Sequence, residues 1–338
     1  MTTEAKIQLS SSEVGTIWMA YQSTTANLMI FNIFKDKTID KEAKNILSEY
    51  ITDILNVKGN IVNIFNKANA VIPMGFDERD IIREEPPLFD DIFNIMFLRQ
   101  IMKLKLGHSS VFTAISLMKE VHDLYKLEYD IADKYFVMTT NYLLGKGVLA
   151  QPPAVTIPKR IEFIENINYM SGYNILSEKR SLNTIEVGYI NEAIENNILG
   201  MQLMTGFAQV AKEDEVKTYF IEGKEISKNI ITELSAVLLQ SDIQPPSTWA
   251  GKATDTIKTP FSDKLMMYII SLITSSALGF NALGTSFSMR GDLHVKLALI
   301  VKNTFTYSKK GGKMMIKHGW MEEPPQMEDR NQLTKIKE

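Results

Sequence analysis

The sequence is an internal duplication, because it matches itself when it is shifted by 173 residues. Identical residues at this shift include Glu13 with Glu186 and Pro87 with Pro260. One residue is then lost, and a shift of 172 carries the match on to the proline pairs at 152–153 and 324–325. A single gap over about 140 aligned positions indicates a repeated domain, which constrains the fold more than any other pattern here. We place the gap after Asp90, which matches Asp263 at the first shift.

The repeat divides the 338 residues into two domains, at 1–153 and 182–326, and a polar tail at 327–338. The segment 154–181 between them has no counterpart. It contains apolar residues at Ile161, Phe163 and Ile164, which are uncommon in a disordered linker. We therefore expect the linker to pack along the domains.

The composition is typical of a globular protein and excludes several classes of site. Hydrophobic residues make up 45% of the chain and charged residues 23%. Lysine and arginine number 37 against 40 acidic residues, a net charge of −3, so nucleic acid is not an expected partner. The chain has no cysteine, which excludes disulfides and thiolate metal sites and favours a reducing compartment. Residues 1–12 lack the apolar core of a signal peptide, and we expect a cytoplasmic protein.

Two stretches without charge, at 14–34 and 265–289, are long enough to cross a membrane. Both contain many Ser, Thr and Asn residues, which lipid would leave without partners. Their counterparts in the other repeat also carry charges, so we expect buried helices and no membrane span. The charged counterparts are Glu192 and Glu195 for the first stretch, and Arg99, Lys103 and Lys105 for the second.

Apolar residues recur at helical spacing throughout both copies and predict four helices in each. Prolines close the second helix of each copy, and a loop of about a dozen residues follows. We expect the third helix to begin at Pro87 and Pro260, with Asp90 and Asp263 one turn inside it. Four helices with one longer connection indicate a four-helix bundle, so the predicted fold is all-α with two bundles in tandem.

Carboxylate metal centres in such bundles require Glu-x-x-His pairs, and the sequence contains none. We therefore expect no metal and no cofactor. If a metal site exists in an unorthodox form, its candidate ligands are the matched residues Glu49, His122, Glu222 and His294. A solvated ion pair for the glutamates and a place in the first turn of the fourth helix for the histidines explain the same matches.

Two further motifs have structural interpretations. Glu13 and Glu186 each follow a capping residue by three positions, which predicts a capping box at the start of the first helix of each copy. The run Gly311-Gly312-Lys313 lacks the spacing of a phosphate loop and predicts close packing of helices or a kink.

Three motifs carry a resemblance to a known family. They are Ile72-Pro73-Met74-Gly75-Phe76 with Glu78-Arg79-Asp80, Phe261-Ser262-Asp263-Lys264-Leu265-Met266-Met267, and Gly319-Trp320-Met321-Glu322-Glu323-Pro324-Pro325. In this order they resemble the tandem proteins of endospore-forming bacteria that form the domain of unknown function 3231 family. The resemblance implies two ferritin-like four-helix bundles and no established activity. Many members have a histidine in the second helix, where this chain has Val57 and Ile230.

We therefore expect a non-enzymatic helical protein with a structural or protein-interaction role, which the resemblance connects with sporulation. Its partner would be another protein or a second copy of the chain. Two alternatives stay open: a ferritin-like metal-binding or oxidoreductase protein, and a protein that binds a small apolar ligand between helices. The methionine-rich stretch at 265–289 motivates the last of these. The cytoplasm, the forespore and the spore are the compartments that fit.

Overall fold

The computed structural model describes residues 8–172, 179–247 and 252–335, and within them the fold is all-α. The first repeat contains four long helices, α1 (Ser11–Lys37), α2 (Lys41–Lys67), α3 (Asp91–Ala114) and α4 (Lys119–Gly145). The second contains α5 (Thr184–Val210), α6 (Asp214–Leu239), α7 (Asp263–Phe287) and α8 (Gly291–Lys317). Three short helices complete these ranges, η1 (Glu78–Asp80), η2 (Ile167–Met170) and α9 (Arg330–Leu333).

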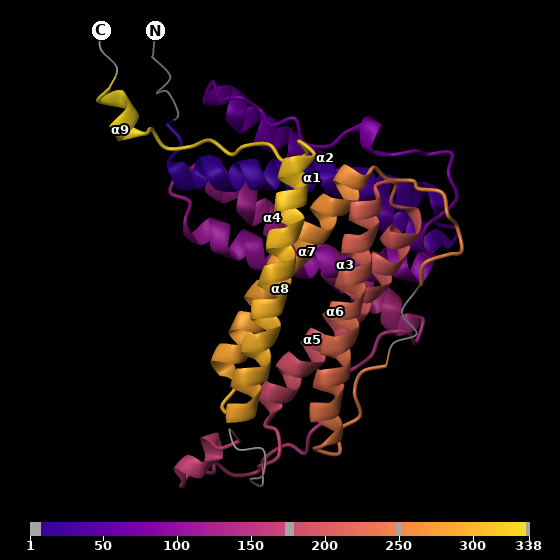
Figure 1. The fold of residues 1–338 in the computed structure, drawn as a ribbon, viewed down its shortest axis with the longest axis vertical. Coiled ribbons are helices and arrows are strands. Elements are labelled where there is room, and N and C mark those ends of the chain that lie inside the picture. The colour runs from indigo at the N-terminus through magenta and orange to yellow at the C-terminus, as the bar shows by residue number, and fades with distance from the viewer. Residues whose placement is uncertain (1–7, 173–178, 248–251, 336–338) are drawn as a thin grey trace.

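The long helices pack in consecutive pairs, α1 with α2, α3 with α4, α5 with α6 and α7 with α8. Figure 1 shows the helices of the first repeat running across the molecule and those of the second running nearly at right angles to them. The predicted all-α fold with two tandem repeats is confirmed. A specifically ferritin-like topology, which the family resemblance implied, stays a prediction.

Local signals set most helix ends where they were expected. The fourth helix of each repeat is followed by a glycine with positive φ, Gly147 at 68° and Gly319 at 66°, which is the usual helix stop. The predicted start of the third helix was wrong. Asp90 and Ser262 are the N-caps, and α3 and α7 begin one residue later, three or more residues beyond the prolines.

The prolines do not start helices because their segments pair with each other across the repeats. Two isolated antiparallel bridges join Ile81 to Phe261 and Phe89 to Ala253. Four backbone hydrogen bonds lie beside them, from the N–H groups of Ile82, Asp90, Thr254 and Ser262 to the carbonyls of Pro260, Lys252, Leu88 and Asp80. We call the paired segments 80–90 and 252–262 the clasp.

The clasp corrects the position of the gap between the repeats. The two bridges are equivalent to each other only when the residue numbers of the first copy are raised by 172. Ile81 then corresponds to Ala253, and Phe89 corresponds to Phe261. Asp91 and Asp263 are then equivalent, and each accepts hydrogen bonds from two N–H groups at the start of the second helix of its repeat. The missing residue therefore lies before residue 81, and the match of Asp90 with Asp263 was wrong by one position.

A ring of four buried phenylalanines lies beside the clasp and belongs equally to both repeats. Phe34 and Phe207 are equivalent, as are Phe89 and Phe261. Each ring contacts two of the others, with centroids 6.1–6.3 Å apart. All four side chains are at most 3% exposed. The hydrophobic core thus continues from one repeat into the other.

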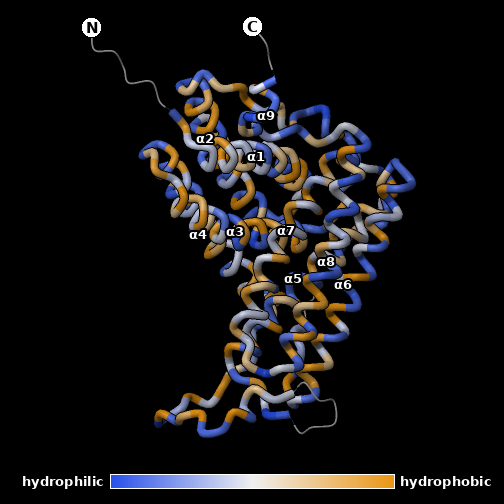
Figure 2. Tube along the Cα trace, turned by 60° about the vertical axis from the view of Figure 1, so that its left-hand side comes forward, coloured by the Kyte–Doolittle hydropathy of each residue, from blue (hydrophilic) through white to orange (hydrophobic). Residues whose placement is uncertain are grey.

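The linker prediction was wrong for most of the segment. Residues 154–168 are exposed, and Ile161 and Phe163 are each 86% exposed. Figure 2 shows this part of the chain projecting at the end of the second repeat that lies away from the first. Contact with the second repeat is made near Tyr169, whose ring lies 3.9 Å from the guanidinium carbon of Arg180. The sequence shows that these side chains are apolar, but it does not show whether another part of the protein covers them.

Among the described residues, α7 alone is long and apolar enough to cross a membrane by length and composition. In the structure 44% of its most apolar window is buried inside the protein. Leu265, Met266 and Ile269 are fully buried in the core. The first turns of the helix therefore lie in the core, whereas less than half of its most apolar window is buried.

Two glycines make room for a pair of tyrosines between α6 and α8 in the second repeat. Tyr219 of α6 and Tyr307 of α8 stack with ring centroids 4.2 Å apart, and each hydroxyl donates to the other residue's carbonyl. A Cβ at Gly223 would lie 2.2 Å from the Tyr307 hydroxyl, and one at Gly311 would lie 2.3 Å from the Tyr219 hydroxyl. The close packing predicted for the Gly311-Gly312 run is confirmed at Gly311.

We predict that Gly311→Ala lowers the free energy of unfolding by about 1–3 kcal/mol, because the new methyl group would displace the stacked tyrosines. Its neighbour provides the control, since a Cβ at Gly312 would have no atom within 4 Å. Gly312→Ala should raise stability by about 0.5–1 kcal/mol through helix propensity alone. Urea unfolding of the two variants measures the difference. Equal effects would contradict this account of the tyrosine pair.

Candidate functional site: a cavity between the repeats

The repeats contact each other through two equivalent pairs of helices. α1 packs on α7, and α3 packs on α5. Because α1 is the counterpart of α5 and α3 that of α7, the two contacts use the same positions, as in a symmetric dimer. Any difference between them therefore arises from the side chains.

At the contact of α3 with α5 the space is closed by ion pairs. Arg99 lies 2.8 Å from Glu195, and Lys103 lies 3.0 Å from both Glu192 and Glu195. Burial alone would raise the pKa of Glu195, but the charges of Lys103 and Arg99 outweigh it and lower that pKa. Four of the five charges that distinguish the copies in sequence therefore pair with one another at the contact of α3 with α5.

At the contact of α1 with α7 the equivalent positions are uncharged, and a cavity opens there. The counterparts of Glu192 and Glu195 are Met19 and Gln22, and those of Arg99 and Lys103 are Ser271 and Ser275. All four line a cavity of about 370 Å³. This volume lies within the usual range for small-molecule sites, roughly 300–1,000 Å³. We call it the inter-repeat cavity.

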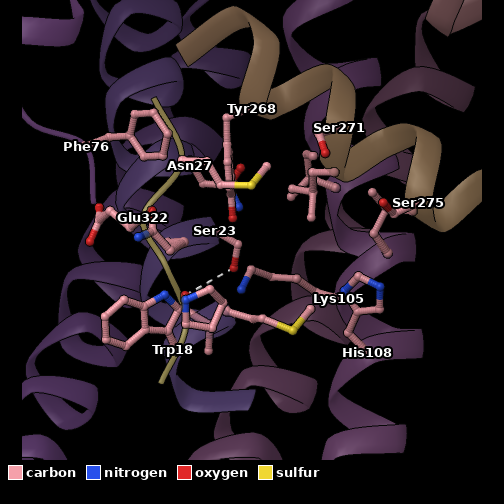
Figure 3. A pocket seen from close by; sticks show the side chains of 18 of the residues that line it. Trp18, Ser23, Asn27, Phe76, Lys105, His108, Tyr268, Ser271, Ser275 and Glu322 are labelled. Carbon is pink, nitrogen blue, oxygen red and sulfur yellow. Dashed lines mark hydrogen bonds between the residues drawn. The ribbon is translucent and has the colours of Figure 1, made fainter. Parts of the chain in front are cut away.

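Three helices, α1, α3 and α7, contribute most of the residues that line the inter-repeat cavity. Lining residues recur at helical spacing on α1 at 19, 22, 23 and 27, on α3 at 101, 104, 105 and 108, and on α7 at 268, 271, 272 and 275. Figure 3 shows these side chains around the space, with Phe76 and Tyr268 at one end and Lys105 and His108 at the other. Aromatic rings form much of the apolar surface; they are Trp18, Phe76, Phe112, Tyr268 and Trp320.

The charged groups of the inter-repeat cavity are already paired within the protein. Lys105 donates to Glu128 at 2.9 Å, and both side chains are nearly buried, at 12% and 5% exposed. Burial, together with the charge of Lys105, lowers the pKa of His108, so its imidazole is neutral near pH 7. Glu322 accepts hydrogen bonds from the N–H groups of Met74 and Gly75, at 2.8 and 2.7 Å.

The three motifs behind the family resemblance meet at the aromatic end of this cavity. Glu322 of the last motif binds the backbone of the first, and Lys264 of the middle motif donates to the Gly75 carbonyl at 3.1 Å. Phe76 packs against Tyr268 with ring centroids 4.8 Å apart and ring planes tilted by 51°. Gly75 has φ of 64°, and a Cβ there would lie 2.5 Å from Thr25 Oγ1, so the turn requires glycine.

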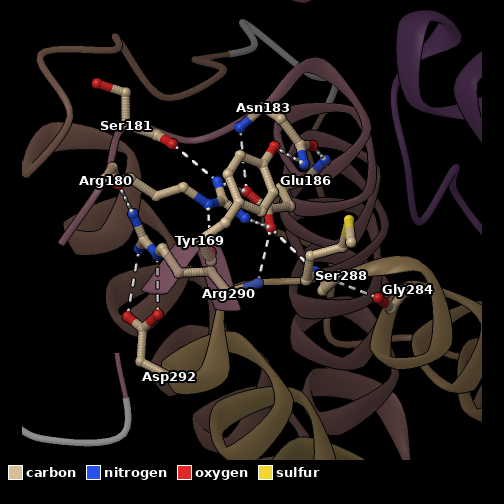
Figure 4. A network of polar contacts seen from close by, with 10 residues as sticks. Tyr169, Arg180, Ser181, Asn183, Glu186, Gly284, Ser288, Arg290 and Asp292 are labelled. Atoms are coloured by element: carbon tan, nitrogen blue, oxygen red, sulfur yellow. Dashed lines mark hydrogen bonds and ion pairs between the residues drawn. The ribbon is translucent and has the colours of Figure 1, made fainter. Parts of the chain in front are cut away.

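The predicted capping boxes are confirmed, and the two glutamates also accept hydrogen bonds from a second helix. The side chains of Ser10 and Asn183 cap α1 and α5 by accepting from the N–H groups of Glu13 and Glu186. In return, each glutamate side chain accepts from the N–H group of its cap residue. Each glutamate also accepts from two N–H groups at the start of the fourth helix, where the side chain of neither N-cap residue caps the helix. Figure 4 shows Glu186 at the centre of this network, with Arg180 donating to it at 2.6 Å.

The candidate metal ligands are not brought together. Glu49 lies 4.0 Å from Lys134, His122 lies 3.9 Å from Asp123, and Glu222 pairs with Lys310. The first three side chains are 42–56% exposed, and His294 is half-buried. Within the described ranges no group of three or more His, Asp or Glu residues has a geometry that could hold a metal ion.

Sequence reasoning missed the cavity residues, although one signal pointed to them. Four of the positions at which the copies differ in charge lie at the helix contacts between the repeats, and among the described residues ion pairs join α3 to α5 but not α1 to α7. The difference was interpreted only as evidence against a membrane span. Locating the cavity also required knowing that α1 faces α7, which no local pattern indicates.

We predict that Glu186→Gln lowers the free energy of unfolding near pH 7 by about 3 kcal/mol, from the pKa difference and its free-energy equivalent. Burial would raise the pKa of Glu186, but bonds from Arg180 and three backbone N–H groups lower it from 4.5 to about 2. Its stabilisation is therefore complete above about pH 4.5 and is lost as the pH falls towards 2.

Urea unfolding of the wild type and of Glu186→Gln between pH 2 and pH 7 tests this prediction. The stability difference between the two proteins should shrink below about pH 4.5. The control is Glu222→Gln, which removes an exposed ion pair and should cost less than about 1 kcal/mol at any pH. A constant deficit for Glu186→Gln across the range would contradict the assignment.

Comparisons with known proteins identify the family. The family model described as "Protein of unknown function (DUF3231)" matches residues 1–161 and again residues 170–333. No curated protein matches the chain. A crystal structure from Bacillus halodurans C-125, provisionally described as a spore coat protein, is 16% identical and has a TM-score of 0.41. It covers 44% of this chain and 98% of its own, and at this distance it carries no argument about role. The two matches of the family model show that the chain belongs to the DUF3231 family and contains its domain twice.

Proposed function

We propose that this protein is a non-enzymatic binding protein that holds a small, largely apolar organic molecule in the inter-repeat cavity. The observation that carries the proposal is the contrast between two equivalent helix contacts. One is closed by ion pairs, and the other is lined by uncharged side chains around about 370 Å³. An apolar pocket with a few polar groups at fixed positions is the usual form of a small-molecule site.

The proposal replaces a structural role as the first hypothesis, and it extends the alternative of an apolar ligand between helices. The position of the family motifs also supports the proposal, because Phe76, Lys264 and Glu322 belong to three different motifs and bind one another's segments at the aromatic end of the cavity. The metal-binding alternative has no convergent ligands in the described part of the chain. We propose that the protein lies in the cytoplasm, as the sequence predicted, or in the forespore or spore, as the family resemblance implied.

The neutral dye N-phenyl-1-naphthylamine tests the proposal, because it fluoresces in apolar sites and accepts energy from tryptophan. Trp18 and Trp320 both line the cavity, so excitation of tryptophan should give dye emission on binding. We predict binding in the micromolar range by the wild type. The double variant Gln22→Glu, Ser271→Arg places in the cavity the ion pair found at the equivalent contact, and it should weaken binding at least about tenfold.

A second double variant, Ser48→Glu with Thr52→Arg, makes the same change in charge on α2 and is the control for stability and dye binding. Thermal unfolding establishes that all three proteins are folded. Absence of dye binding by the wild type, or equal binding by the wild type and the cavity variant, would overturn the proposal.

A protein-interaction role remains a second candidate because of the exposed linker. Six apolar side chains within thirteen residues are 56–86% exposed, which is an unusual patch for a free surface. They are Val155, Ile157, Ile161, Phe163, Ile164 and Ile167. We propose that a second copy of the chain covers them.

We predict that the wild type self-associates in sedimentation velocity over a concentration series, and that replacing Ile161, Phe163 and Ile164 with serine abolishes the association. Burial of these side chains would stabilise the dimer, and serine removes that contribution. Lys159→Ser with Arg160→Ser changes the same segment without its apolar residues and should leave association unchanged. A wild type that stays monomeric at all concentrations would exclude self-association through this segment.

A further inference from the structure

The inter-repeat cavity contains a buried amide without a partner. Asn27 on α1 is fully buried and lines the cavity. Neither its amide nitrogen nor its amide oxygen has a hydrogen-bond partner among the described residues. A buried polar group left in this state destabilises the fold, so its presence in a helix core calls for an explanation.

A purely structural role does not explain Asn27. The equivalent position in the second repeat is Gly200, so the bundle does not need an amide there to fix the register of its helices. Asn32, on the same helix, donates to the Leu28 carbonyl, as a helical asparagine usually does when it satisfies itself locally. Asn27 lacks such a bond, and a small turn of its side chain toward the cavity would offer both of its buried polar atoms to a molecule there.

The charges around the cavity indicate the charge of that molecule. Lys105 is paired with Glu128, and Glu322 is paired with two backbone N–H groups. A charged ligand would have to break one of these pairs or stay unpaired in an apolar space, and both are unfavourable. The aromatic rings of Trp18, Phe76 and Tyr268 offer flat apolar surfaces on the walls.

We propose that the inter-repeat cavity selects neutral ligands with a flat apolar body and an amide-like group, which pairs its donor and its acceptor with the Asn27 side chain. Figure 3 shows Asn27 near Tyr268, on the side of the cavity where Phe76 lies. This inference rests on the proposed binding function and narrows it to a class of ligand.

Three naphthalenes of nearly equal shape test the inference by displacing N-phenyl-1-naphthylamine at pH 7. They are 2-naphthamide, which donates and accepts, 2-acetylnaphthalene, which only accepts, and 2-naphthoate, which is charged. We expect 2-naphthamide to displace the dye at a concentration about tenfold lower than 2-acetylnaphthalene and lower still than 2-naphthoate. This ranking needs no variant and does not depend on the folding of a mutant.

The variant Asn27→Leu then tests whether Asn27 causes the preference for 2-naphthamide. The variant should unfold at the same temperature as the wild type or a higher one, because an unpartnered buried amide is replaced by an apolar group. Relative to its own affinity for the dye, it should lose its preference for 2-naphthamide over 2-acetylnaphthalene. The matched control is Thr24→Val, which removes another unpartnered buried polar atom of α1 outside the cavity lining.

The outcomes separate the two proposals. No dye binding by the wild type would sink the binding function itself. Dye binding with equal displacement by all three naphthalenes would leave the binding function standing and overturn the assignment to neutral amide-like ligands. Preference for 2-naphthamide that survives in Asn27→Leu, or disappears equally in Thr24→Val, would overturn the role of Asn27.

Discussion

The clasp and its ring of phenylalanines decide how the two repeats are arranged. Phe34 and Phe89 from one copy and Phe207 and Phe261 from the other form a closed set of edge contacts, and the bridges at Phe89 and Phe261 fix the backbone around them. Burying four aromatic side chains in one place is among the largest favourable terms available to a contact of this size. Because each repeat supplies equivalent residues, the contact has the form of a symmetric dimer within one chain.

This arrangement places α1 against α7 and α3 against α5. The two contacts are equivalent in backbone position, but their side chains differ. Arg99 and Lys103 pair with glutamates at one contact and leave little room there. Ser271 and Ser275 occupy the same places at the other, where shorter side chains leave a cavity. The functional proposal therefore rests on a loss of symmetry that duplication made possible, since one copy of a contact can hold the repeats together while the other diverges.

The motifs that carry the family resemblance act on the same region. Glu322, at the far end of the chain, binds the N–H groups at 74 and 75, and Lys264 binds the carbonyl at 75. Because distant charged side chains hold both the N–H and the carbonyl of Gly75, the two peptide units that flank this residue cannot easily change their orientation. Phe76, the next residue, is consequently fixed as a wall of the cavity beside Tyr268.

Local physical chemistry made much of this protein predictable from its sequence alone. The duplication, the helices, the capping boxes at Glu13 and Glu186 and the glycine stops at Gly147 and Gly319 all depend on residues close together in the chain. The tertiary structure alone decided the position of the gap, the exposure of Ile161 and Phe163, and the cavity at Asn27. These features depend on which surfaces meet across more than 150 positions of sequence, and periodicity records that a helix face is apolar without recording which partner covers it.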